Sequence, residues 1–192
     1  MNSIRRCLAW LIDSGVGSQT SESDARYVRF LNASLLLFAL GQIPILSLLV
    51  MLKLQSPMVV NLLALSLCAV GYWLNRRRYH LGAKILVIAV VTFNTAYFSL
   101  IMGSTAPAHL WLVPAAVLGV LAFKPTEWVY ALSLIGCAMV SFVVFEFNHH
   151  DIVPLVNPFD DPLDALRSAQ GSTVSAVGLT LVLVGMMHRR FA

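Results

Sequence analysis

Long apolar runs separated by short polar stretches are the main pattern of this chain. Six such runs occur, at 30–52, 58–74, 83–102, 108–123, 128–147 and 171–187. Each has about the roughly 17–25 residues that a helix needs to cross a bilayer, with 108–123 the shortest. Mostly short connections between such runs favour helices over the alternating strands of a membrane barrel. The pattern predicts an all-α integral membrane protein built as a six-transmembrane-helix bundle.

The low content of charged residues supports this interpretation. Charged residues make up 11% of the chain and hydrophobic residues 58%, whereas a soluble domain has roughly 25% charged residues. Too few charges remain to cover a water-facing surface. The composition therefore excludes an ordinary soluble domain, and most of the helix surface is expected to face lipid.

The basic residues predict the orientation of the bundle. An even number of spans puts both termini on one side, and eleven of the thirteen basic residues then share that side. They are Arg5, Arg6, Arg26, Arg29, Arg76, Arg77, Arg78, Lys84, Lys124, Arg189 and Arg190. Only Lys53 and Arg167 fall on the other side. By the positive-inside rule both termini are cytoplasmic, and the net charge of +4 reflects topology, with no nucleic acid expected as a partner.

The first 29 residues are expected to form a cytoplasmic leader. Ile4, Leu8, Leu11 and Ile12 share one helical face, with arginines beside it. This arrangement is typical of a short amphipathic helix lying on the membrane surface, although a flexible leader would have the same composition. The transmembrane domain then covers 30–187, and 188–192 begin a cytoplasmic linker.

Polar side chains recur within the outer half of the spans, where each needs a partner or a cavity. The candidates for a ligand pocket opening outward are Gln42, Asn61, Asn94, Tyr97, His109, Trp111 and Glu146. Two alternatives remain open at this point. The polar groups could form ordinary hydrogen bonds between helices, and Trp111 could be an aromatic anchor at the membrane surface.

Motifs for catalysis or cofactors are not found. The chain has no phosphate-binding glycine loop, no paired carboxylates, no zinc-protease motif and no facing histidines at mid-membrane depth. We therefore expect no enzyme activity, no cofactor and no metal site in this chain. The adjacent His149, His150 and Asp151 in an outer loop could bind a metal, but a solvated loop is the simpler interpretation.

Small residues recur along the last apolar run. Gly171, Ser175, Gly178 and Gly185 are spaced by four, three and seven residues, which places them along one helical face. Small residues let membrane helices approach closely, so the face is predicted to pack against a partner helix. The partner is either the same helix of a second subunit or another helix of its own bundle.

Several short stretches resemble a known kind of membrane module. They are WLIDSGV at 10–16, RYVRFLN at 26–32, NRRR at 75–78, AHLW at 108–111 and LAFKP at 121–125. Their order is similar to that in the six-transmembrane N-terminal receptor or anchor module of bacterial signalling enzymes. These enzymes include membrane-anchored class III adenylate cyclases, quorum-sensing histidine kinases and diguanylate cyclases.

The resemblance implies a location in the bacterial inner membrane and a homodimer. It also implies an outward-facing site for a small, unidentified ligand, signalling through the last helix, and a cytoplasmic output domain following Ala192. The expected function is therefore a membrane sensor or anchor that detects a periplasmic or membrane-borne ligand. The alternative is a small membrane transporter or channel, although Glu146 is the only acidic residue within a span.

Overall fold

The computed structural model describes residues 2–18, 20–51, 53–103, 107–148, 151–152 and 174–185. All regular elements in these ranges are helices, which confirms the predicted all-α class for the described part of the chain. They are α1 (Asn2–Asp13), α2 (Glu22–Met51), α3 (Gln55–Arg76), α4 (His80–Met102), the 3-10 turn η2 (Ala108–Trp111), α5 (Leu112–Ala122), the 3-10 turn η3 (Pro125–Glu127) and α6 (Trp128–Asn148). A last helix covers Val174–Gly185.

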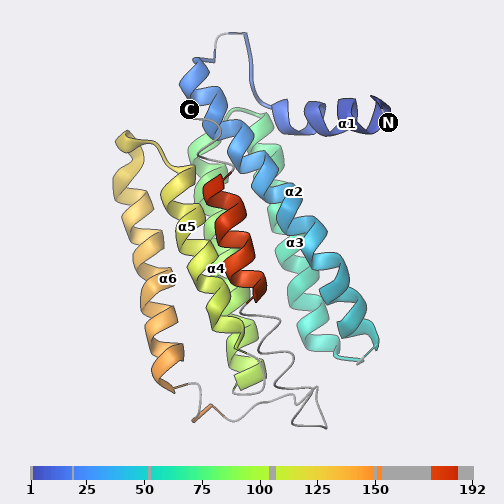
Figure 1. The fold of residues 1–192 in the computed structure, drawn as a ribbon, viewed down its shortest axis with the longest axis vertical. Coiled ribbons are helices and arrows are strands. Elements are labelled where there is room, and N and C mark those ends of the chain that lie inside the picture. Colours follow the sequence, from blue (N-terminus) through green and yellow to red (C-terminus); the bar gives the residue numbers. More distant parts are fainter. Residues whose placement is uncertain are drawn as a thin grey trace.

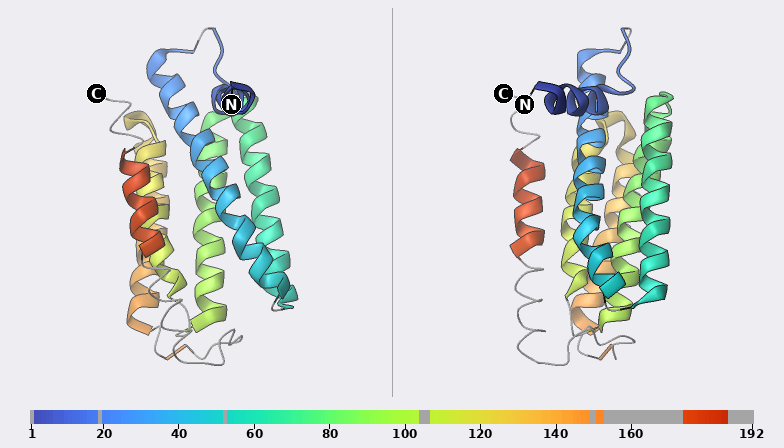
Figure 2. Two further views of the ribbon diagram at one scale, coloured as in Figure 1. Left: turned by 45° about the vertical axis from the view of Figure 1, so that its right-hand side comes forward. Right: turned by 90° about the vertical axis from the view of Figure 1, so that its right-hand side faces the viewer.

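The helices from α2 onward lie side by side along the long axis of the molecule, and α1 lies across one end of them (Figures 1 and 2). We call this the α1 end; the turns from α3 to α4 and from α5 to α6 lie there too. The opposite, distal end carries the connection from α2 to α3 and the end of α6. Consecutive helices are therefore antiparallel, as short connections require.

Four helices are long and apolar enough to cross a membrane: α2, α3, α4 and the segment Pro125–Asn148. Two further apolar helices, Ala108–Ala122 and Val174–Gly185, are shorter. Large apolar side chains such as Leu40, Phe93 and Val129 are exposed on the outside of the long helices. This outer surface is suited to lipid, because a water-facing helix would carry polar residues there.

The first long helix begins earlier than the apolar run indicated. The predicted span starts at residue 30, but α2 starts at Glu22. Ser21 caps the helix, since its Oγ accepts a hydrogen bond from the backbone N–H of Asp24 at 3.2 Å. Glu22 and Asp24 in the first turn also interact favourably with the positive end of the helix dipole. The last eight residues assigned to the leader are therefore helical.

The bundle is held together by two apolar clusters of small and large side chains. One joins α2, α3 and α4 through Leu31, Leu35, Ala64, Cys68, Ala83, Val87 and Val90. The other joins α2, α4, α5, α6 and the last helix through Phe30, Ile88, Leu118, Ala122, Phe123, Ala131 and Leu183. Alanines within both clusters allow the helix backbones to approach closely, which matters where lipid supplies no hydrophobic force between helices.

Three hydrogen bonds fix α1 and the segment after it against the bundle. Asn32 Nδ2 on α2 donates to the backbone oxygens of Ile12 and Ser14, at 2.9 and 2.7 Å. The Tyr72 hydroxyl on α3 donates to the Leu11 oxygen at 3.1 Å. The chain then turns at Gly15, which has φ +93° and passes directly over the backbone of Asn75. A Cβ at this position would lie 2.6 Å from the Asn75 oxygen.

Gly15→Ala is expected to release α1 from the bundle. The substitution combines a disfavoured backbone conformation, costing roughly 1–3 kcal/mol, with a collision against backbone that cannot move aside. Limited proteolysis of the purified protein should show faster cleavage in residues 13–21. Gly17→Ala is the matched control, because its Cβ meets only the flexible guanidinium end of Arg78. Equal cleavage of both variants would contradict the proposed role of Gly15.

Candidate functional site

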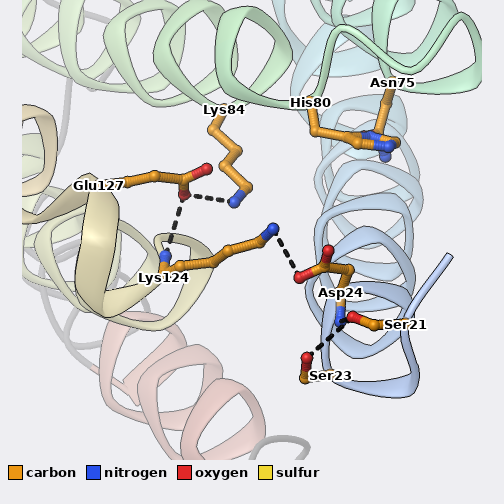
Figure 3. A network of polar contacts seen from close by, with 8 residues as sticks. All are labelled: Ser21, Ser23, Asp24, Asn75, His80, Lys84, Lys124 and Glu127. Atoms are coloured by element: carbon orange, nitrogen blue, oxygen red, sulfur yellow. Dashed lines mark hydrogen bonds and ion pairs between the residues drawn. The ribbon is translucent and has the colours of Figure 1, made fainter.

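A buried ion pair lies at the α1 end of the bundle (Figure 3). Lys84 Nζ on α4 is 2.6 Å from Glu127 Oε2 in η3, and the Lys84 side chain is only 1% exposed. The rings of Tyr27 and Phe123 lie 5.2 and 5.7 Å from the ammonium nitrogen. A buried ammonium group is tolerated when a carboxylate and aromatic faces replace its water.

The same carboxylate continues into a chain of polar contacts, shown in Figure 3. Glu127 Oε2 also accepts the backbone N–H of Lys124 at 3.0 Å, and Lys124 Nζ lies 2.6 Å from Asp24 Oδ1 on α2. We call Asp24, Lys84, Lys124 and Glu127 the clamp. It joins the first turns of α2 and α4 to the connection between α5 and α6.

A second polar chain links α1 to the turn between α3 and α4. Asn32 Oδ1 accepts a hydrogen bond from Asn75 Nδ2 at 2.7 Å, and Asn75 Oδ1 lies 2.6 Å from His80 Nδ1. Because an amide oxygen only accepts, His80 Nδ1 carries the proton in this contact. Both asparagines are fully buried and every polar atom of the Asn32 amide is used. This chain therefore contributes to the position of α1.

At the distal end, the structure brings together two of the residues predicted to line a pocket. His109 Nε2 in η2 is 3.0 Å from Glu146 Oε2 near the end of α6. The imidazole is buried and lies 6.0 Å from the Phe142 ring, whereas half of the Glu146 side chain is exposed. The pair fixes η2 against α6 and presents a carboxylate at the surface of the distal end.

Tyr97 and Trp111 occupy different positions. The Tyr97 hydroxyl lies 2.9 Å from Ser56 Oγ and so bridges α4 to the start of α3. Trp111 is half-buried at the end of η2.

The remaining three predicted residues are buried amides whose side-chain oxygen, and in Asn61 also the nitrogen, has no hydrogen-bond partner among the described residues. Within the described part of the chain, Gln42 Oε1, both polar atoms of Asn61 and Asn94 Oδ1 bond to nothing. All three side chains are more than nine-tenths buried, and Asn61 is completely so. An unpaired buried polar group costs about 1–3 kcal/mol, so each of these atoms calls for a partner such as a water molecule or a ligand.

These three amides lie at a similar depth on consecutive helices. Gln42 and Asn94 lie nine and eight residues before the distal ends of α2 and α4, and Asn61 lies six residues after the start of α3. At about 1.5 Å per residue, they are roughly 9–14 Å from the distal end. Since α3 packs against both α2 and α4, the three residues form one layer, which we call the amide layer.

A cavity of about 240 Å³ opens between α3 and α4 beside this layer. Its walls are mostly apolar and include Val60, Leu63, Leu67 and Phe93, with Asn94 at its edge. The cavity is open on one side, on the face that carries exposed apolar residues. An apolar or amphipathic molecule could therefore reach Asn94 from the side of the bundle. This lateral entrance differs from the predicted ligand pocket, which was expected to open toward the outer side of the membrane.

The small residues of the last helix point mostly away from the bundle. Ala176 and Leu183 are its buried residues, whereas Ser175 and Gly185 are exposed. A Cβ added at Gly178 or Gly185 would meet no atom within 4 Å. Gly171 lies outside the described residues. In the described range, this face is therefore free to contact a second chain.

The clamp and its aromatic neighbours are contacts that the sequence did not predict. Lys84 and Lys124 were counted only as evidence for topology, because their partners are far away in the sequence. One local pattern could have pointed to two of these carboxylates. Asp24 follows Ser21 by three positions and Glu127 follows Lys124 by three, which is the spacing of a helix-start motif. In the described residues no three metal-ligating side chains come together. His149 and His150 lie outside those residues.

Comparison with known proteins adds nothing to these observations, since no family model, curated protein or solved structure matches the chain.

Glu127→Gln is expected to destabilise the bundle strongly. The amide keeps an acceptor for the Lys124 N–H but leaves the Lys84 ammonium buried without a carboxylate, at a cost of about 3–5 kcal/mol. Unfolding by denaturing detergent in mixed micelles measures the change. Glu22→Gln, which breaks only an exposed pair with Arg26, should change stability by about 0–1 kcal/mol.

Adding Lys84→Met to Glu127→Gln should restore most of the lost stability, because the double variant no longer buries an unpaired charge. If the double variant is as unstable as Glu127→Gln alone, the buried ammonium is not the cause of the loss.

Asn61→Leu is expected to stabilise the protein by about 1–3 kcal/mol, because leucine has a similar volume and removes two unpaired polar atoms. The matched control is Asn32→Leu, which removes three hydrogen bonds and should be destabilising. The same unfolding assay compares the two variants. A loss of stability for Asn61→Leu as large as for Asn32→Leu would show that the Asn61 amide is needed by the fold itself.

Proposed function

We propose that the chain is the membrane-embedded sensor of a signalling protein. In this proposal six helices span a bacterial inner membrane with both termini in the cytoplasm. A small ligand binds at the amide layer, and the last helix carries the signal to a cytoplasmic output domain following Ala192.

The distribution of charge supports this orientation. Nine of the described basic residues lie at or near the α1 end, and only Lys53 lies at the distal end. The α1 end is therefore the cytoplasmic end under the positive-inside rule, and the amide layer lies in the outer half of the membrane. The two shorter helices, Ala108–Ala122 and Val174–Gly185, complete the six spans with residues that flank them.

The unpaired amides are the observation that carries the proposal. Buried polar groups in lipid are expensive, and those retained without a partner on three adjacent helices favour a binding function. Amides are neutral and both donate and accept, so they suit an uncharged ligand with carbonyl or hydroxyl groups. The apolar cavity beside Asn94 supports a ligand that also has an apolar part and enters from the membrane.

The last helix has the contacts needed to carry the signal. Leu183 packs in the same cluster as Phe30 and Phe123, and Phe123 also contacts the Lys84 ammonium of the clamp. The outward positions of Ser175, Gly178 and Gly185 support close packing against the same helix of a second subunit. A ligand that favours one packing of these helices would alter the pairing of the two output domains.

The stretches that carry the resemblance to signalling modules also fit this proposal. Residues 10–16, 26–32 and 75–78 contribute to the contacts that dock α1, and 121–125 supply Phe123 and Lys124. The 108–111 stretch supplies His109 for the distal pair. An adenylate cyclase, a histidine kinase or a diguanylate cyclase is accordingly the expected output domain.

An adenylate cyclase domain fused after Ala192 tests the proposal in cells lacking their own cyclase. Cyclic AMP should be formed, because the fusion point is cytoplasmic, and its level should change when lipid extracts of the source membrane are added. Asn61→Leu should abolish the change. Ser133→Ala, which removes only a hydroxyl bonded within α6, is the control and should keep it.

Two outcomes would contradict the sensor proposal. A periplasmic location of the fused domain would rule out the topology. A response that Asn61→Leu, Asn94→Leu and Gln42→Leu all leave unchanged would remove the amide layer from the binding site. Solute flux through proteoliposomes containing the chain, lost in the same variants, would favour a transporter or channel instead.

A further inference from the structure

The cationic side chains at the α1 end fall into two groups. Four of them each pair with an acid: Arg26 with Glu22, Arg29 with Asp13, Lys84 with Glu127 and Lys124 with Asp24. Five others are exposed and have no carboxylate partner in the part of the chain that the structure describes. They are Arg5, Arg6, Arg76, Arg77 and Arg78.

No carboxylate in the described part of the chain is available to neutralise the five exposed arginines. The acids described at the α1 end are Asp13, Glu22, Asp24 and Glu127, and each is already bound to a cation. Like charges held close together raise each other's energy unless an anion lies between them. An anion that binds these arginines would therefore come from outside the described residues.

The arrangement around Trp10 is the most specific part of this surface. The guanidinium of Arg76, at the end of α3, lies 5.6 Å from the centre of the Trp10 ring on α1. Arg6 lies one turn before Trp10 on the same face of α1, so the two arginines flank one exposed indole. The hydrogen bonds of Asn32 and Tyr72 to the last turn of α1 hold these residues in register with α3.

A parallel pair lies on α3 itself, where the Arg77 guanidinium is 5.3 Å from the centre of the Trp73 ring. Trp10, Trp73 and Tyr79 are all more than half exposed. Tryptophan and tyrosine at the end of apolar helices are typical of the headgroup region of a bilayer, where a ring meets lipid on one side and water on the other.

We propose that Arg6, Trp10 and Arg76 form a binding site for the phosphate of an anionic phospholipid in the inner leaflet, with Arg77 and Trp73 beside it. A guanidinium group binds a phosphate through two N–H groups that point at two of its oxygens, and the Trp10 indole would contact the upper part of the acyl chains. This inference rests on the proposed orientation, in which α1 lies at the cytoplasmic surface. Bound lipid would then hold α1 flat against the membrane and next to the segment that enters α2.

Native mass spectrometry of the full chain, released from detergent containing equal amounts of phosphatidylglycerol and phosphatidylcholine, tests the site directly. The wild-type protein should retain phosphatidylglycerol with a preference of about fivefold to thirtyfold, since each of the two arginines near an anionic headgroup contributes roughly fivefold. Arg6→Gln combined with Arg76→Gln should reduce the preference to near one. Arg76→Lys, which keeps the charge, should retain part of it.

Arg26→Gln is the control, because it removes one positive charge from the same end at a residue already paired with Glu22. A loss of preference as large as in the double variant would indicate general attraction and overturn the site. The site is also overturned if the wild-type protein shows no preference for phosphatidylglycerol over phosphatidylcholine. Displacement of the lipid by RNA or an acidic peptide at equal charge concentration would overturn it as well. The assay measures lipid retention and needs no output domain. Its result can therefore be interpreted even if the sensor proposal fails in the cyclase assay.

Discussion

A buried lysine can stay charged in an apolar bundle only if other groups replace the water it has lost, and the packing at the α1 end depends on meeting this condition at Lys84. Glu127 supplies the opposite charge, and Tyr27 and Phe123 supply two aromatic rings. These partners come from α2, from the end of α5 and from the following turn. The ion pair therefore helps to hold in one register helices that otherwise meet mainly through apolar side chains.

The distal half of the bundle is built on the opposite principle. The buried polar side chains of the clamp and of the Asn32–Asn75–His80 chain are bonded to one another, whereas the amide layer leaves the side-chain oxygens of Gln42, Asn61 and Asn94 unpaired. This difference supports the proposed sensor, which would be fixed near its output domain and adjustable near its ligand. The last helix lies along both regions, since Leu183 belongs to the inner apolar cluster while Ala176 lies beside Leu110 and Val113.

Part of this structure could be predicted from the sequence, because its cause is local. Long apolar runs determine where the long helices lie, and a polar residue within such a run is expected to be buried, as Asn61 and His109 are. The helix α2 begins eight residues before the predicted span, and the apolar run gives no information on the cap at Ser21. The clamp could not be predicted in this way: Glu127 and Asp24 lie 43 and 100 positions from their lysines, and hydropathy does not report contacts between distant residues. The sequence also could not predict that the amide layer has unpaired atoms, because it does not distinguish a buried asparagine with hydrogen-bond partners from one without them.

The central claim is that the amide layer binds a molecule other than the protein itself. An experimental structure of the full chain, purified in nanodiscs with its native lipids, tests this most directly. The account predicts density for a small molecule within hydrogen-bond distance of Asn61 and Asn94, with its apolar part in the cavity between α3 and α4. Direct hydrogen bonds from Asn61 to Gln42 or Asn94 in a closed, dry layer, with no density beside them, would contradict it.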